Sequence, residues 1–153
     1  MQIRTASPSD YAVLEKLVLE SFEPITWARP LEEKFGLLNS LDWQARWKLR
    51  FKKIFSEQLI LVGVADGVVV AMSSSTIDPE AALCYIDLLA VAPGHQGHGY
   101  GREMLRATIR QGQEHGARHV HLNCMVSNKN ANELYESEGF EEVAREIRWF
   151  RKI

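Results

Sequence analysis

The feature that most constrains the fold of this chain is a glycine-rich turn between an apolar run and a helical pattern, within residues 84–110. The run from Cys84 to Val91 is too hydrophobic to alternate, which is typical of a strand covered on both faces. Three alternating glycines follow it, and apolar residues then recur at helical spacing. The start of a helix offers unpaired N–H groups and the positive end of the helix dipole. The sequence therefore predicts a site for a pyrophosphate.

The spacing of these glycines distinguishes between the known motifs that bind a pyrophosphate. Counted from Gly97 or Gly99, the sixth position holds Arg or Met, so the dinucleotide motif G-x-G-x-x-G is absent. No glycine precedes a Lys-Ser or Lys-Thr pair, which excludes the ATP/GTP loop. The motif present is Gln96-x-x-Gly99-x-Gly101, directly after the strand. It resembles the acetyl-CoA signature of the GCN5-related N-acetyltransferase (GNAT) superfamily, (R or Q)-x-x-G-x-(G or A).

A second motif resembles the same family. Asn128, Tyr135 and Gly139-Phe140 fit the pattern N-x-x-A-x-x-x-Y-x-x-x-G-F. The resemblance covers residues 58–145 well, whereas the first 57 residues fit only as a strand followed by helices. It implies a single α/β (α+β) domain over residues 1–153, with a central mixed, mostly antiparallel sheet flanked by helices. It also implies an N-acetyltransferase that moves the acetyl group of acetyl-CoA to a primary amine by direct attack in a ternary complex.

By the same resemblance, the sheet splays beside this strand, and acetyl-CoA lies in the gap. Main-chain groups at the end of the strand and in the glycine turn, with residues of the second motif, should bind it: Leu89, Ala90, Val91, Gln96, Gly97, His98, Gly99, Tyr100, Gly101, Asn128, Asn130 and Tyr135. Tyr135 occupies the position of a phenol that protonates the leaving thiolate. An ordinary phenol and thiol differ in pKa so that this transfer is uphill by about 2 kcal/mol.

The general base stays open between two residues. Asp87 lies where some relatives have a carboxylate, although it could equally be held by neighbouring main-chain groups. His121 is the second candidate, because the imidazole side chain commonly accepts protons near neutral pH. Where ribosomal-protein acetyltransferases have a glutamate, this chain has Asn123, which cannot accept a proton. His119 and His121 lack a third ligand nearby, so we expect no metal.

The remaining chain divides into recognisable elements. The patterns predict a strand at 2–5, a helix from the Ser7 cap to Phe22, a loop or an irregular entry to a second helical region at 23–30, and a helix capped by Asp42. They further predict a hairpin turning at Asp66-Gly67, a helix to about Glu114, a strand at 118–125 and a helix at 131–137. In the first helix, Val13, Leu14, Leu17, Val18 and Phe22 form the expected apolar stripe.

The helix after Asp42 carries two distinct faces. Trp43, Trp47, Phe51 and Phe55 repeat at four-residue spacing and are expected to pack in the core. Arg46, Arg50 and Lys53 form a basic face, interpreted as solvated, with an acidic acceptor or partner as the alternative. Tryptophans 27, 43 and 149 are further candidates for lining an acceptor pocket.

The C-terminus departs from the family. Only thirteen residues follow Phe140, enough for one long strand or a tight hairpin, where relatives have two strands. One strand would leave an open sheet edge, which proteins normally cover. We therefore expect a homodimer in which the partner covers or completes this edge.

Composition and cysteine usage indicate which partners and which compartment to expect. The net charge of −2 with 25% charged residues favours neither nucleic acid nor an anionic membrane as a partner. Cys84 and Cys124 form no C-x-x-C motif and are interpreted as reduced thiols of a cytoplasmic protein. The acceptor, a small-molecule or peptide amine, cannot be identified from the sequence. The alternatives to an enzyme are an acyl-CoA-binding sensor or an interaction module on the same fold.

Overall fold

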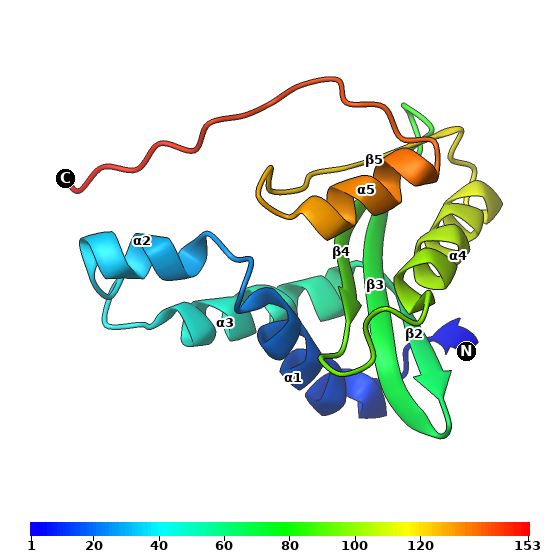
Figure 1. The fold of residues 1–153 in the computed structure, drawn as a ribbon, viewed down its shortest axis with the longest axis horizontal. Coiled ribbons are helices and arrows are strands. Elements are labelled where there is room, and N and C mark those ends of the chain that lie inside the picture. Colours follow the sequence, from blue (N-terminus) through cyan, green and yellow to red (C-terminus); the bar gives the residue numbers. More distant parts are fainter.

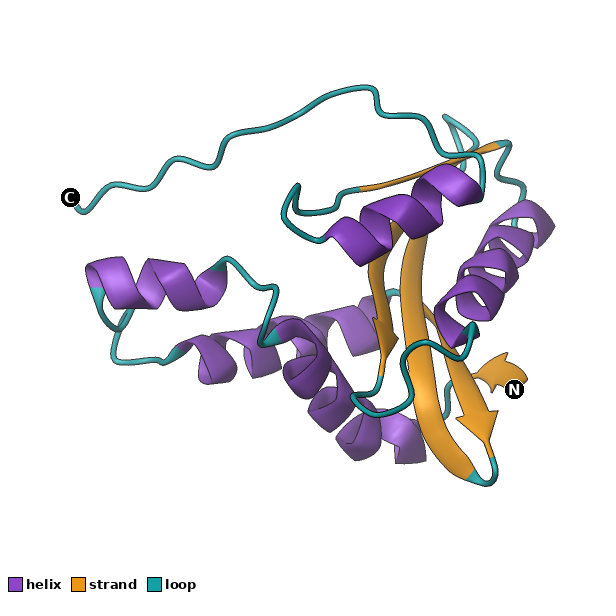
Figure 2. Cartoon of the chain, viewed as in Figure 1, coloured by secondary structure: helices purple, strands orange, loops and turns teal.

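The computed structural model describes all 153 residues as one mixed sheet with helices on both faces (Figures 1 and 2). The elements, in chain order, are β1 (Gln2–Thr5), a 3-10 turn (Pro8–Asp10), α1 (Tyr11–Phe22), α2 (Ala28–Phe35), α3 (Trp43–Glu57), β2 (Leu59–Ala65), β3 (Val68–Asp78), β4 (Leu83–Val91), α4 (Tyr100–Glu114), β5 (His119–Leu122) and α5 (Lys129–Ser137). The α+β class and the mostly antiparallel sheet are confirmed. No helix combines the length and apolar character needed to span a bilayer.

The sheet follows the chain order β1-β2-β3-β4-β5. The first four strands pair antiparallel, and β4 pairs parallel with β5. The predicted hairpin between β2 and β3 is confirmed, because Asp66 and Gly67 both have positive φ angles, +50° and +76°. Parallel pairing of β4 with β5 requires a crossover, which α4 supplies.

Two layers of helices bury the two faces of this sheet. On one face, α1 and α3 contribute the main apolar cluster, centred on Leu14, Val18, Trp47 and Phe51. On the other face, α4 packs Met104, Leu105 and Ala107 against the strands, and α5 lies beside it (Figure 1). The aromatic stripe of α3 is thus core, as predicted, with Phe55 at its half-buried margin.

A β-bulge in β4 decides which residues face which layer. Ser74 of β3 pairs with Leu88 and Ser75 pairs with Ile86, so Asp87 is an extra residue without a partner in β3. The strand before the bulge, at Ile86, packs against α4, whereas Leu88 packs against α1 and α3. The apolar run therefore covers both faces in turn, which explains why its sequence does not alternate simply.

Several local predictions are confirmed by hydrogen bonds. The main-chain N–H of Ser7 donates to Asp10 Oδ2 (2.7 Å), and Arg4 makes two bonds to the same carboxylate (2.7 and 2.8 Å). Asp42 accepts the N–H of Ala45 (2.7 Å) as the cap of α3. The start of α3 is thus confirmed, whereas after Ser7 a 3-10 turn precedes α1, which begins at Tyr11.

One detail predicted for the first helix is wrong, and the segment that follows this helix is now resolved into a loop and a helix. Val13 is 41% exposed and lies outside the apolar face of α1. The segment 23–30, predicted as a loop or an irregular entry to a second helical region, leads into α2, which begins at Ala28 and contains Pro30. Proline is tolerated there because the N–H groups in the first turn of a helix form no intrahelical hydrogen bonds.

The predicted C-terminal strand or hairpin is absent. No residue after Ser137 belongs to a helix or strand, and no main-chain hydrogen bond is made beyond Phe140. The strand predicted for 118–125 is also shorter and ends at Leu122. Figure 1 shows the last residues as an extended chain along the rim, ending on the side of α2. The outer edge of β5 therefore stays open.

Candidate functional site

The glycine turn between β4 and α4 is shaped to bind an anion with main-chain groups. Gly94, Gly97 and Gly99 have φ angles of +83°, +78° and +80°, which favour glycine. The main-chain N–H groups of residues 96–102 donate no hydrogen bond within the protein. Since these groups lead into the positive end of α4, together they can hold a pyrophosphate.

The glycines of this turn differ in the reason why a side chain is disfavoured at each position. A Cβ at Gly97 or Gly99 would meet no atom within 4 Å, so backbone conformation alone accounts for glycine there. A Cβ at Gly101 would make ordinary contacts with Leu134 Cδ2 (3.6 Å) and Val91 Cγ2 (3.7 Å). Gly94, three residues before Gly97, shares the left-handed conformation of Gly97 and Gly99. It joins the predicted turn residues for that reason.

Side chains within the turn stabilise its shape. His98 Nδ1 lies 2.9 Å from the carbonyl oxygen of Gln96, and the His98 ring stacks on Tyr100 at 5.8 Å between centroids. Gln96 Nε2 donates to the carbonyl of Val91 (3.3 Å), which ties the turn to the end of β4. These contacts leave the main-chain N–H groups free.

A gap opens in the sheet next to this turn. β4 and β5 pair only from Leu83 with His119 to Ile86 with Leu122. Beyond that point the bulge at Asp87 turns β4, and its remaining residues have no neighbour on the β5 side. The splayed sheet that the sequence resemblance implied is thus confirmed.

The strand end presents main-chain groups to this gap. Ala92 N–H donates to Val70 of β3 (2.8 Å). Because successive residues of a strand turn their N–H and C=O groups to opposite edges, Ala90 also faces β3, whereas Leu89 and Val91 face the gap. The carbonyl of Val91 already accepts Ser21 Oγ (3.1 Å) from α1. Leu89 is therefore left with both of its groups available.

Tyr135 of α5 lies next to the same gap. It is half-buried, packs against Phe140 (5.8 Å between centroids), and its hydroxyl has no hydrogen-bond partner. Burial, and secondarily the charge of a Cys124 thiolate, raises the pKa of Tyr135 well above its ordinary value. Burial also raises the pKa of the Cys124 thiol nearby.

The two asparagines predicted to contact the ligand differ in the structure. Asn128 caps α5, and its Oδ1 accepts Ala131 N–H (3.4 Å), which leaves the amide nitrogen free. Asn130 is exposed and makes no side-chain hydrogen bond. Asn132 instead braces the loop, because its Nδ2 donates to the carbonyls of Met125 and Asn128, both at 3.0 Å.

Asp87, the bulged residue, is held by two side chains from α3 and its end. Arg50 Nη2 donates to Oδ1 (2.5 Å), and Gln58 Nε2 donates to Oδ2 (2.9 Å). The Asp87 side chain is 10% exposed, and the Arg50 guanidinium also stacks over Trp47 at 4.7 Å. Asp87 is thus bonded to side chains, not to the neighbouring main-chain groups considered as the alternative.

The second candidate base lies on the same side of the sheet. His121 is exposed, and its ring contacts Tyr85 at 4.9 Å between centroids. Burial, followed by the charge of Asp87, raises the pKa of Tyr85. Tyr85 therefore adjoins both Asp87 and His121. The sequence offered no specific signal for Tyr85, Arg50 or Gln58, because their roles arise from contacts across elements.

The basic face predicted for α3 is only partly solvated. Arg50 is engaged with Asp87, and Arg46 pairs with Glu32 at 3.6 Å with 18% of its side chain exposed. Lysines 48, 52 and 53 remain exposed. Among the tryptophans, Trp43 is core, Trp27 is 36% exposed and Trp149 is 86% exposed. The predicted solvated face therefore holds for Arg50, whose side chain is 45% exposed, and for Lys53, but not for Arg46.

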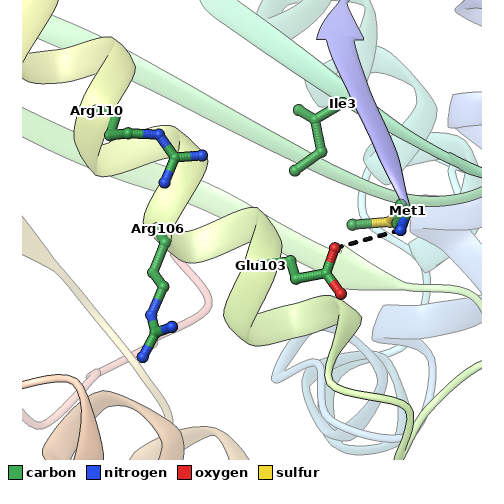
Figure 3. Close-up of a pocket in the computed structure, with 5 residues that line it drawn as sticks. All are labelled: Met1, Ile3, Glu103, Arg106 and Arg110. Atoms are coloured by element: carbon green, nitrogen blue, oxygen red, sulfur yellow. Dashed lines mark ion pairs between the residues drawn. The ribbon is translucent and has the colours of Figure 1, made fainter.

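A separate groove of about 430 Å³ lies between β1 and α4, away from this site (Figure 3). Figure 3 shows Met1, Ile3, Glu103, Arg106 and Arg110 along it, with the Met1 amine 3.4 Å from Glu103 Oε2. None of the predicted site residues lines it. No group of three or more His, Cys, Asp or Glu side chains that could hold a metal ion occurs in the structure.

The structure thus combines a splayed sheet, a glycine turn with unbonded main-chain N–H groups and a half-buried phenol on α5. The chain belongs to the acetyltransferase (GNAT) family, whose model matches residues 19–140. It is 35% identical over 78 residues to a ribosomal protein bS18-alanine N-acetyltransferase of Haemophilus ducreyi. That match spans 51% of this chain and 52% of the relative, or about half the length of each.

Solved structures share the fold at low identity. An aminoglycoside N-acetyltransferase, AAC(6')-Iy in complex with CoA, has a TM-score of 0.70 at 16% identity, covering 99% of this chain and 95% of its own. The ribosomal-protein-S18-alanine N-acetyltransferase from Escherichia coli has a TM-score of 0.72 at 20% identity, covering 94% and 79%. These likenesses establish the fold.

Proposed function

We propose that this protein is an N-acetyltransferase that uses acetyl-CoA as its co-substrate. The observation that carries the proposal is the run of unbonded N–H groups at residues 96–102, which adjoins the gap beside β4. The related AAC(6')-Iy structure is a complex with CoA. Residues 96–102 would bind the pyrophosphate, and the free main-chain groups of Leu89 would bind the arm as an added strand does.

Acetyl transfer proceeds by direct attack in a ternary complex. A bond forms between the acceptor nitrogen and the acetyl carbon, and the carbon–sulfur bond breaks. Tyr135 then donates its proton to the thiolate and regains one from solvent. Neither cysteine has a histidine–carboxylate partner that would make it a covalent nucleophile. Asn128 would contact the bound arm through its free amide nitrogen.

The acceptor is a primary amine that must lose a proton. For a lysine-like amine, forming the neutral base at pH 7 costs about 4.6 kcal/mol, whereas for an α-amine it costs about 1 kcal/mol. Asp87 still has unused lone pairs beside those bonded to Arg50 and Gln58. We assign it, directly or through water, as the first acceptor of that proton, with His121 as the alternative.

The acceptor class can be tested with a panel drawn from the relatives and from simple amines. One relative is a ribosomal protein bS18-alanine acetyltransferase and another acts as an aminoglycoside acetyltransferase. A peptide with an N-terminal alanine, aminoglycosides, polyamines and lysine should be assayed for thiol release from acetyl-CoA. Turnover with at least one amine is the expected result, and Gly99→Asp should lower it at subsaturating acetyl-CoA. Binding of acetyl-CoA without turnover on any amine would instead support the sensor alternative.

We further propose that the protein is a cytoplasmic homodimer. Its basis is the open outer edge of β5 together with a C-terminal segment that makes no main-chain hydrogen bond. Unpaired strand edges are normally covered. Light scattering at micromolar concentration tests the dimer, and a monomer there contradicts it.

A further inference from the structure

The helix α5, which carries Tyr135, is attached to the rest of the fold by few contacts. None of its residues is fully buried. Its apolar anchors, Leu134 and Tyr135, lie at the margin of the cluster around Leu105 of α4. Figure 1 shows α5 beside α4, with a loop leading into it and a long segment leading out. Elements with few buried apolar contacts open most easily, so α5 needs further contacts to keep a fixed orientation.

Glu138, the residue that ends α5, supplies these contacts. Arg106 Nε donates to Glu138 Oε2 (2.7 Å), and Arg106 Nη2 donates to Oε1 (3.0 Å). Arg102 Nη1 also donates to Oε1. The Glu138 side chain is only 8% exposed, and no residue of α5 itself forms a hydrogen bond or an ion pair with α4. Glu138 is thus the polar link between the two helices.

This link fixes an orientation more than it adds stability. Hydrogen bonding from Arg106 outweighs burial and lowers the pKa of Glu138, so the carboxylate is charged at neutral pH. A guanidinium that meets a carboxylate through two parallel hydrogen bonds sets its direction as well as its distance. The two arginine side chains are 41% and 58% exposed, and ion pairs with such exposure stabilise a fold little.

The link joins the two parts of the proposed acetyl-CoA site. Arg102 is the third residue of α4, next to the turn whose free N–H groups would bind the pyrophosphate. Glu138 follows Tyr135 by three positions, so the two side chains lie near the same side of α5. Leu134 Cδ2 lies 3.6 Å from the place where a Cβ of Gly101 would be. The orientation of α5 on α4 therefore sets the distance from the phenol to the phosphate-binding turn.

We propose that Glu138 is a positioning residue for acetyl transfer, which keeps the Tyr135 hydroxyl beside the thioester sulfur by holding α5 against α4. This inference rests on the function proposed above and adds a residue that contacts neither acetyl-CoA nor the acceptor. A ligand bound at its pyrophosphate end presents its sulfur at a fixed place along the gap. A displacement of the phenol by about 1 Å from that place can slow the reaction about 100-fold.

Glu138→Gln tests this role with little change in shape. The amide keeps one acceptor oxygen but loses the charge that the two arginines share. We expect kcat at saturating acetyl-CoA to fall about 10–100-fold with the most reactive amine of the panel. The Kd for acetyl-CoA, measured by calorimetry, should be unchanged, because the turn that binds the pyrophosphate is intact. Hydrogen exchange of the α5 amides should become faster.

Two further variants show whether the contact itself is responsible. Glu136→Gln is the matched control, because Glu136 lies on the same helix, is exposed and carries the same charge; it should keep the wild-type kcat. Arg106→Gln removes two of the three hydrogen bonds from the side of α4 and should also lower kcat. The variant with both Arg106→Gln and Glu138→Gln should lose no more than Glu138→Gln alone, because both changes break the same contact.

A double-mutant cycle with Tyr135→Phe determines whether Glu138 acts through the phenol. If it does, Glu138→Gln should lower kcat much less in the Tyr135→Phe background than in the wild type, because the group to be positioned is already gone. A merely structural loss would lower the amount of active enzyme equally in both backgrounds, so the two effects would multiply. Multiplied effects contradict the inference.

The outcomes separate this inference from the function on which it rests. If the wild type turns over and Tyr135→Phe lowers kcat, but Glu138→Gln keeps the wild-type kcat, the positioning role is wrong and the enzyme stands. The same holds if Glu138→Gln raises the Kd for acetyl-CoA at unchanged kcat, or if Tyr135→Phe itself keeps the wild-type kcat. If the wild type turns over no amine, the proposed function is wrong, and the positioning role with it.

Discussion

The charge at Gly99 offers a direct test of the anion-binding turn. Gly99 has a φ of +80°, and a Cβ there would meet no atom within 4 Å. Asn and Asp both tolerate the left-handed conformation better than other residues do, with a strain on the order of 1 kcal/mol. Gly99→Asn and Gly99→Asp are nearly identical in shape and differ in one charge. Their difference therefore isolates the electrostatic part of acetyl-CoA binding.

The size of that difference follows from Coulomb's law. Two unit charges about 6 Å apart interact by roughly 3 kcal/mol at an effective dielectric constant of about 20. The turn is exposed, so salt and water reduce this repulsion. A net difference of about 1–2 kcal/mol remains, which makes binding to the Asp variant about 5–30-fold weaker than to the Asn variant.

Isothermal titration calorimetry with acetyl-CoA measures both variants. The ratio should shrink when salt is raised, and it should approach one for acetyl-pantetheine, which has no phosphate. Gly116 offers a matched control, because it also has a positive φ (+90°) and open space but ends α4 at the far side. The same substitutions there should affect stability without affecting affinity. Equal acetyl-CoA affinities for the Asn and Asp variants of Gly99 would refute the turn as the phosphate site.

Three further results are expected. Tyr135→Phe should lower kcat by about 10²–10⁴-fold with unchanged acetyl-CoA affinity; an unchanged kcat rejects the phenol as the acid. In pH–rate profiles, Asp87→Asn should remove the fall in rate on the acidic side, whereas His121→Ala should leave it intact. If both variants keep the wild-type profile, solvent accepts the proton. Bonding to Arg4, and then to Ser7, lowers the pKa of Asp10. Asp10 therefore stabilises the fold above the unfolded pKa near 3.9, and this stability is lost as pH falls below it. The Tm gap between wild type and Asp10→Asn should be wide at pH 7 and narrow toward pH 3; a constant gap contradicts this.

Local sequence patterns were sufficient for most elements and for the anion-binding turn. Hydrogen bonds that cap a helix or close a hairpin join residues a few positions apart, as at Ser7, Asp42 and Asp66-Gly67. The glycines at 97 and 99 are likewise explained by their own backbone angles. Such features depend on chemistry that is complete within one short segment, so the sequence alone determined them.

Contacts between distant segments were decided only by the tertiary structure. The bulge at Asp87 depends on the pairing of β3 with β4, and it brings Arg50 and Gln58 onto a carboxylate far away in the chain. The same bend ends the pairing of β5 at Leu122 and leaves the segment after Phe140, predicted as a strand or a hairpin, without a neighbour. Strand pairing requires a partner edge in space, and alternation along one segment carries no information about where that edge lies.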